Sequence, residues 1–173
     1  VQDPADVLRR IWASPTFEIH GLSGGYHGQG VKTVVPGHAE LKVSMRLVPN
    51  QVPERVFALF KKHVAKINPT IKVEREGMLH PFKGSFAGPY VDCVKRAVKA
   101  GFGKEPAFVR EGGSIGAVVT MQNLWKVPIL FLGLSLPEHG YHAPNEYFDW
   151  GQASGGMKAF ARYFEELARL GKG

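Results

Sequence analysis

The sequence has very little cysteine and no long hydrophobic run. Cys93 is the single cysteine among 173 residues, which excludes an internal disulfide. Its place in a helical pattern predicts a buried, inert thiol and not a nucleophile. No apolar run approaches the roughly 18 residues of a membrane-spanning helix, and no charged-then-apolar signal segment opens the chain. These absences predict a cytoplasmic protein with no membrane partner.

The chain also has no concentrated charge of one sign. Its formal net charge of +7 raises nucleic-acid binding as a hypothesis. However, Lys and Arg are scattered along the sequence, and no basic cluster alternates with aromatic residues as a base-stacking surface requires. The sequence therefore predicts no nucleic-acid partner. A basic balance also suits substrates that carry a free carboxylate.

Residues 1–78 are predicted to form a small two-layer unit, a sheet covered on one face by an amphipathic helix. Apolar and polar side chains alternate over residues 41–47, which predicts a strand with one buried face and places Arg46 on its polar face. Pro53 suits the first position of a helix, and Asn68-Pro69 ends that helix. The expected elements are a helical turn at 7–12, a strand at 16–20, a Gly-rich connector at 21–30, a strand at 41–47, a helix at 53–67 and a strand at 71–74.

Residues 79–173 are predicted to alternate helices with buried strands, as in an α/β sheet with helices on its faces. Prolines and glycines between residues 77 and 89 mark the crossing from the first unit. The fold class is therefore α/β (α+β), with one domain at 1–78 and another at 79–173. The expected elements are helices at 90–100, after residue 114 and around 157–170, and strands at 107–109 and 127–134.

Three side chains are candidates for chemistry, each with a structural alternative. Ser114 follows two glycines at a helix N-terminus, where it either binds an anion such as a substrate carboxylate or only caps the helix. Arg46 offers a fork of donors for a carboxylate, or is a solvated charge on the strand. His142 lies in a loop after a buried strand, and is either one ligand of a metal site completed elsewhere or an exposed loop residue.

Three segments together resemble the zinc-dependent metallopeptidase family of aminoacylases, carboxypeptidase G and carnosinase-type dipeptidases. The segments are REGGSIG at 110–116, the run from 127 through SLPE to GYHAPNE at 140–146, and the upstream run that ends in SMRLVPN at 44–50. The resemblance extends from about Pro15 to Leu170, and its closest branch is the dipeptidases. It implies that residues 1–78 are the latter part of a lid, or dimerisation, domain, and that 79–173 are the C-terminal segment of the catalytic domain.

The resemblance implies a role for five side chains. His142 is a zinc ligand, and Arg46 grips the C-terminal carboxylate of the substrate. Ser114 contacts the substrate, and Thr33 reaches into the neighbouring subunit's site in a homodimer. His80, which matches less closely, helps bind the substrate or the tetrahedral intermediate. The implied substrate is a small peptide, and the implied cofactor is zinc, two ions in the full-length parent, with manganese or cobalt as alternatives.

The sequence also departs from the family. Gly116 stands where a proline is usual, and His27 and His139 occupy positions that are not usually histidine, so we interpret both as surface residues. A His-x-Asp metal pair, a bridging aspartate and a Glu-Glu pair are missing, and the chain starts at Val1. We therefore expect the C-terminal portion of an enzyme, separated from its N-terminal catalytic half, with the general base upstream.

Such a portion is expected to be inactive alone and to bind no metal by itself. The alternative is a non-catalytic dimerisation or binding module whose lid strands pair edge to edge with a second copy.

Overall fold

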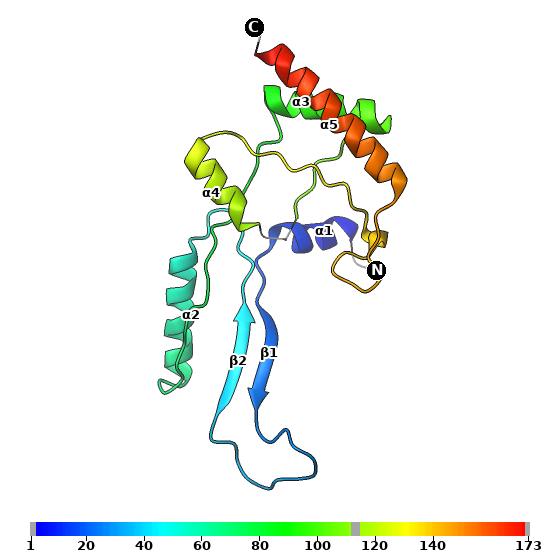
Figure 1. Ribbon diagram of the computed structural model, residues 1–173. Coiled ribbons are helices and arrows are strands. Elements are labelled where there is room, and N and C mark those ends of the chain that lie inside the picture. The colour runs from blue at the N-terminus through cyan, green and yellow to red at the C-terminus, as the bar shows by residue number, and fades with distance from the viewer. Residues whose placement is uncertain (1–2, 112–114, 172–173) are drawn as a thin grey trace. The chain divides into compact units, whose positions relative to one another are not determined.

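The computed structural model describes residues 3–111 and 115–171 (Figure 1). The chain divides into two compact units, one formed by Val1–Phe82 with Arg110–Val119 and the other by Lys83–Val109 with Thr120–Gly173. The domain boundary that we placed at residue 78 stays a prediction. No helix in the described ranges is long and apolar enough to cross a lipid bilayer.

The first unit contains an antiparallel hairpin of β1 (Glu18–Gly24) and β2 (Ala39–Ser44). Ile19 pairs with Val43 and Leu22 with Leu41, while the register shifts between Ile19 and Gly21. The extra residue on β1 is a β-bulge. Because Val43 and Leu41 are two residues apart on one face of β2, the bulge keeps their partners Ile19 and Leu22 on that same face. The hairpin therefore carries an apolar face, on which Leu22 is 77% exposed.

The observed strands differ from the predicted ones at their ends. β1 runs through Gly21 and Gly24, which we had placed in a Gly-rich connector. A Cβ on Gly21 would lie 3.2 Å from the Cβ of Lys42, so a glycine suits this close cross-strand position. β2 ends at Ser44, but the backbone N–H of Thr16 donates to the carbonyl of Arg46 at 3.1 Å. Pairing between the two chain segments thus extends to Arg46.

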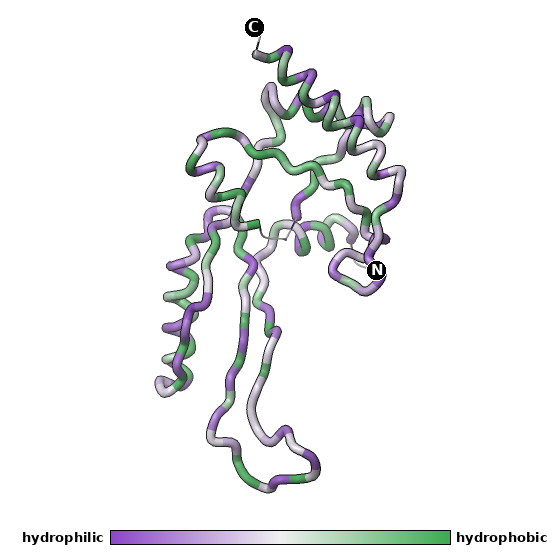
Figure 2. Tube along the Cα trace, in the orientation of Figure 1, coloured by the Kyte–Doolittle hydropathy of each residue, from purple (hydrophilic) through white to green (hydrophobic). Residues whose placement is uncertain are grey.

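Two helices complete the described elements of the first 82 residues. α1 spans Pro4–Ala13 and begins at Asp3, whose side chain accepts a hydrogen bond from the backbone N–H of Ala5. α2 spans Pro53–Ile67, as predicted. In Figure 2, hydrophobic and hydrophilic residues alternate along α2, as expected for an amphipathic helix.

The strand predicted at residues 71–74 is wrong. This segment forms no strand, and no described strand pairs with it, so it gains no ladder hydrogen bonds. Exposed Lys72 and Glu74 instead form an ion pair, which raises the pKa of Lys72 and lowers that of Glu74 through their side-chain hydrogen bond.

The second unit contains α3 (Pro89–Phe102), the 3₁₀ turn η1 (Pro137–His139) and α5 (Trp150–Leu170). A further helix, α4, spans Gly116–Trp125 after the Gly-Gly-Ser segment, where the sequence predicted one. The strands predicted at 107–109 and 127–134 are wrong, because neither segment pairs with a strand in the described ranges. An apolar run predicts burial, but a strand also needs a neighbour.

The core of this unit lies where α5 crosses α3 (Figure 1). Small residues allow the close approach, because a Cβ on Gly101 of α3 would overlap the carbonyl oxygen of Gly155 and lie 2.9 Å from the backbone nitrogen of Ala159. Cys93 is completely buried here, which confirms its predicted burial. The other buried apolar residues of the two helices are Val91, Ala97, Val98 and Ala159.

A buried carboxylate joins the same two helices. Glu166 of α5 is almost fully buried, and its Oε2 accepts a hydrogen bond from Arg96 Nε of α3 at 2.6 Å. Arg162 and Arg169 reach its other oxygen at 2.7 and 2.9 Å. The hydrogen bond from Arg96 lowers the pKa of Glu166, and the three positive charges act in the same direction, while burial opposes them. A buried charge of this kind is tolerated because it is paired and hydrogen-bonded.

The close helix crossing gives a direct test. We expect Gly101→Val to lower the free energy of unfolding by about 3 kcal/mol, because the new side chain overlaps the backbone of α5 and a backbone cannot move aside cheaply. Thermal denaturation measures the change. The control is Gly133→Val, since a Cβ at Gly133 meets no atom within 4 Å. Equal stability of the two variants would contradict this account of the core.

Candidate functional site

The predicted site residues fall in both units of the structure. Arg46, Thr33 and His80 belong to the first unit, and His142 belongs to the second. Ser114 lies outside the described residues.

Arg46 and Thr33 lie at opposite ends of the hairpin. Arg46 follows β2 and is held by the hydrogen bond that its carbonyl accepts from Thr16. Thr33 lies in the connection at the other end, between Gly24 and Ala39. The six residues of β2, at about 3.3 Å each, separate these two ends by about 20 Å. One copy of the chain therefore does not bring these two side chains together.

The connection that carries Thr33 has its own local order. The backbone N–H of Val34 donates to the carbonyl of Lys32 at 3.0 Å, which makes a three-residue turn centred on Thr33. The Tyr26 hydroxyl donates to the carbonyl of Gln29 at 3.0 Å, and the ammonium of Lys32 lies 5.9 Å from the centre of the Tyr26 ring. Thr33 is thus an exposed residue at the tip of a tight turn.

His80 is exposed, and its Nε2 lies 3.9 Å from Glu54 Oε1 at the start of α2. This contact is an ion pair only when the imidazole is protonated, and exposed pairs of this length contribute little to stability. His80 is therefore open to solvent, as a substrate-binding residue needs to be.

His142 lies in a tightly turned loop between η1 and α5. The backbone N–H of Ala143 donates to the carbonyl of Gly140 at 3.0 Å, and that of Glu146 donates to the carbonyl of Ala143 at 3.3 Å. His142 and Asn145 adopt left-handed backbone conformations with φ of 65° and 63°. A non-glycine residue in this region costs about 1–2 kcal/mol, and such strain gathers at functional sites. The His142 side chain is exposed.

His139 is not a surface residue, and our interpretation of it was wrong. Only 2% of its surface is exposed. Its Nδ1 accepts a hydrogen bond from the backbone N–H of Leu136 at 3.1 Å, and its Nε2 lies 2.8 Å from Asp149 Oδ2. An imidazole can be buried at little cost when both nitrogens are satisfied. The polar sequence around it gave no sign of burial, because the partner that satisfies it is ten residues away. His27, in contrast, is exposed, as predicted.

Asp149 is a second residue that the sequence reasoning missed. Its Oδ1 accepts a hydrogen bond from the backbone N–H of Gln152 at 2.9 Å and so caps the N-terminus of α5. This hydrogen bond lowers the pKa of the Asp149 carboxyl, and the contact with His139 acts in the same direction. An Asp directly before an amphipathic helix is a known N-cap signal, and this pattern could have identified the residue.

The metal-ligating side chains of the described residues do not form a complete metal site. Over residues 3–111 and 115–171, no three His, Cys, Asp or Glu side chains gather closely enough to hold an ion. A catalytic zinc has about three protein ligands. His142 fits as one imidazole donor, and the other ligands would have to come from outside the described residues.

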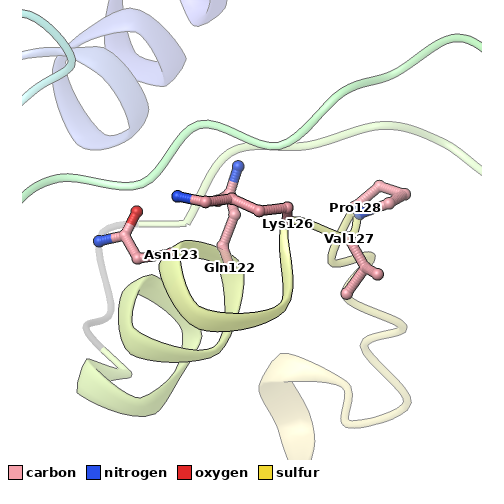
Figure 3. A pocket seen from close by; sticks show the side chains of 5 residues that line it. All are labelled: Gln122, Asn123, Lys126, Val127 and Pro128. Carbon is pink, nitrogen blue, oxygen red and sulfur yellow. The ribbon is translucent and has the colours of Figure 1, made fainter.

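A shallow hollow at the end of α4 contains none of the predicted site residues. It is formed by the last turn of the helix and the residues that follow it (Figure 3). The lining residues are Gln122, Asn123, Lys126, Val127 and Pro128. This set offers one amine and two amides, with no carboxylate, imidazole or hydroxyl.

Comparison with known proteins identifies the first part of the chain. Residues 2–72 match the family described as a peptidase dimerisation domain. These residues are a peptidase dimerisation domain. The homology to metallodipeptidases is not limited to this domain but covers almost the whole chain. The chain corresponds to the C-terminal portion of these enzymes.

Two curated relatives show the extent of the match. The chain is 35% identical over 174 residues to a Cys-Gly metallodipeptidase of Schizosaccharomyces pombe, a match that covers 97% of the chain and 37% of that protein. It is 30% identical over 171 residues to the human Beta-Ala-His dipeptidase, covering 95% of the chain and 34% of the relative. The chain therefore spans just over a third of the length of these relatives.

Solved structures resemble both the dimerisation domain and the segment that follows it. The dipeptidase Dug1p of Saccharomyces cerevisiae matches with a TM-score of 0.83 and 30% identity, covering 98% of the chain and 36% of that structure. Human carnosine dipeptidase 1 matches with a TM-score of 0.79 and 29% identity, covering 98% and 37%. The mixed helical fold with a small sheet is therefore the fold of the corresponding portion of these dipeptidases.

The Asp149 cap predicts a pH dependence. A carboxyl whose pKa is lower in the folded protein than in the unfolded chain stabilises the fold above its unfolded pKa, near 3.8, and this contribution is lost as the pH falls through the folded value. We expect Asp149→Asn to lower the melting temperature more at pH 7 than at pH 3, because Asn keeps the cap but has no charge. The control is Asp92→Asn, on the exposed side of α3. An equal loss at both pH values for Asp149→Asn would contradict the charge-based cap.

Proposed function

We propose that the chain is the C-terminal portion of a zinc metallopeptidase that hydrolyses dipeptides or related short amides with a free carboxylate. The observation that carries this proposal is similarity to metallodipeptidases over both units, in sequence and in fold. The general base and most metal ligands would belong to parts of the enzyme outside this chain. When bound, the metal pair would activate water and polarise the scissile amide.

In this proposal, His142 supplies one ligand. A neutral imidazole is a common zinc ligand, and His142 is exposed in a loop whose backbone is fixed by two turns. Its left-handed conformation supports a functional constraint on the position, since an Asn or Gly would adopt it at less cost.

Three polar side chains would bind the substrate. Arg46 would form a charge-assisted, bidentate pair with the C-terminal carboxylate, and Ser114, which lies outside the described residues, would contact the substrate. His80, exposed near the start of α2, would bind the substrate or the tetrahedral intermediate.

Thr33 would act on the site of a second copy in a homodimer. Arg46 and Thr33 are about 20 Å apart along the hairpin, whereas an extended dipeptide is only about 7 Å long. A single dipeptide therefore cannot contact both residues of one copy. Delivery of Thr33 across a dimer interface removes this conflict, and the dimerisation domain at residues 2–72 supports such an assembly.

The second candidate is a dimerisation or binding module without catalysis. It is favoured by the family match to residues 2–72, and no three His, Cys, Asp or Glu side chains of residues 3–111 and 115–171 gather closely enough to hold an ion. Metal-dependent hydrolysis of Cys-Gly or β-Ala-His by the full-length protein separates the two candidates, because a binding module would leave both peptides intact.

Separate roles for two residues are testable in the full-length protein. We expect Arg46→Ala to lower kcat/KM about tenfold to a hundredfold with normal metal content, because a charge-assisted clamp contributes about 1.5–3 kcal/mol. His142→Ala should lose metal as well as activity. Dipeptide hydrolysis and elemental analysis measure the two effects.

The matched control is Arg55→Ala, an exposed arginine on α2, which should change neither quantity. Equal metal loss in the Arg46 and His142 variants would show that the two residues do not have separate roles.

Assembly gives another test. We expect the chain to sediment as a dimer at micromolar concentration, because the hairpin leaves strand edges and an apolar face open to a second copy. Leu22→Lys should shift the equilibrium toward monomer, since Leu22 lies on the exposed apolar face. Glu40→Lys, on the opposite face of β2, should have little effect. A strict monomer, in both the chain and the full-length protein, would rule out the shared site.

A further inference from the structure

His139 has no role in the site proposed above, yet it is the most deeply buried polar side chain of the described residues. Its ring packs against the rings of Tyr147 and Phe148, with centroid distances of 5.0 and 5.6 Å. These two residues lie at the far end of the loop that carries His142. The imidazole of His139 therefore contacts the C-terminal end of this loop, although His139 itself comes just before the N-terminal end.

The hydrogen bonds of His139 fix a single tautomer. The backbone N–H of Leu136 can only donate, so Nδ1 must be the acceptor and carry no proton. The Asp149 carboxylate can only accept when ionised, so Nε2 carries the proton and donates it at 2.8 Å. The neutral imidazole thus links the backbone of η1 to the N-cap of α5.

The backbone of His139 closes the same loop. Its carbonyl accepts a hydrogen bond from the backbone N–H of Tyr147 at 3.1 Å, while Gly140 begins the loop with φ of 64°. His139 therefore contacts residues 147–149, at the far end of the loop, through its carbonyl, its ring and its Nε2. The near end of the loop follows His139 directly at Gly140.

The loop needs such a constraint from outside. Between its ends, Gly140, His142 and Asn145 all have left-handed backbones, and two of them are not glycine. Only two hydrogen bonds within residues 140–146 support this conformation, at 3.0 and 3.3 Å. Strained residues persist only where the surrounding structure determines them, and His139 supplies the tertiary contacts that do so.

We infer that His139 is a positioning residue for His142: its buried imidazole, held between Leu136 and Asp149, sets the conformation of loop 140–148 and so the direction of the His142 side chain. The inference rests on the proposed role of His142 as a metal ligand. His139 itself does not contact the metal or the substrate.

Three variants of the full-length protein separate the two ring contacts. His139→Asn keeps an acceptor near the position of Nδ1 but is too short to reach Asp149. His139→Gln keeps a donor near the position of Nε2 but loses the acceptor for the N–H of Leu136. His139→Ala loses both contacts.

Two readouts do not depend on turnover. The first is amide hydrogen exchange of peptide 140–148 in the metal-free protein, with peptide 53–67 in α2 as the internal reference. The second is the dissociation constant for Zn²⁺. We expect His139→Ala to raise exchange in the loop with little change in α2, and to weaken Zn²⁺ binding by about tenfold, as is typical when the groups that orient a ligand are lost.

The kinetic split and the conservative variants complete the experiment. We expect kcat to fall while KM for the dipeptide stays within about twofold, because substrate binding would rest mainly on Arg46. His139→Gln should restore loop protection and Zn²⁺ affinity more than His139→Asn, since the Asp149 contact joins the loop to α5, whereas the Leu136 contact only joins His139 to the residue before η1.

Unchanged loop exchange and Zn²⁺ affinity in His139→Ala would overturn the inference. Exchange that rises equally in α2 and the loop would also overturn it, because that pattern indicates a general loss of stability. If His139→Ala does not fold, the Gln and Asn variants decide, and equal loop protection in those two would count against it.

The variant His142→Ala keeps this test distinct from that of the proposed function. If His142→Ala binds Zn²⁺ normally, the metal role of His142 fails, whatever the loop exchange of the His139 variants shows. If His142→Ala loses Zn²⁺ but His139→Ala does not, the metal role stands and the positioning role fails.

Discussion

The close crossing of α3 and α5 is the constraint on which the second unit depends. In the described part of this unit no strand ladder joins distant segments, so two helices must hold the fold by packing. Gly101 lets the backbones approach to a separation that a Cβ would prevent, and Gly155 leaves room for the ring of Phe102. Glu166 then joins the helices through Arg96. The geometric fit and the ion pair act on the same contact, which fixes α5 along its length.

A fixed α5 in turn orders the loop before it. Asp149 uses one carboxylate oxygen to cap the helix and the other to accept a hydrogen bond from His139. The first contact lies within the first turn of α5, and the second reaches back ten residues along the chain. The Asp149 side chain therefore links the N-terminus of α5 to the loop before it, and His142 lies in that loop.

The sequence predicted elements whose signals are local. The helix at 53–67 is set by Pro53, by apolar spacing and by Asn68-Pro69, all within or next to the helix itself. The apolar run at 127–134 was predicted as a strand, but a strand requires a partner, and none lies beside it among the described residues. Burial of His139 likewise depends on Asp149, ten residues away. For the candidate site, the sequence predicted which residue types take part, but it did not predict their tertiary partners.

The separation of Arg46 from Thr33 explains why the proposed site would need a dimer. Strands are stiff and extended, so the length of a hairpin determines how far apart its ends lie, here about 20 Å. A residue at the far end cannot serve the substrate gripped at the near end, but the two-fold axis of a dimer can bring the far end of one copy to the near end of the other. In this arrangement a complete site exists only in the assembled dimer. Weakening of the hairpin interface would then lower activity at low protein concentration without any change in the residues that bind the substrate.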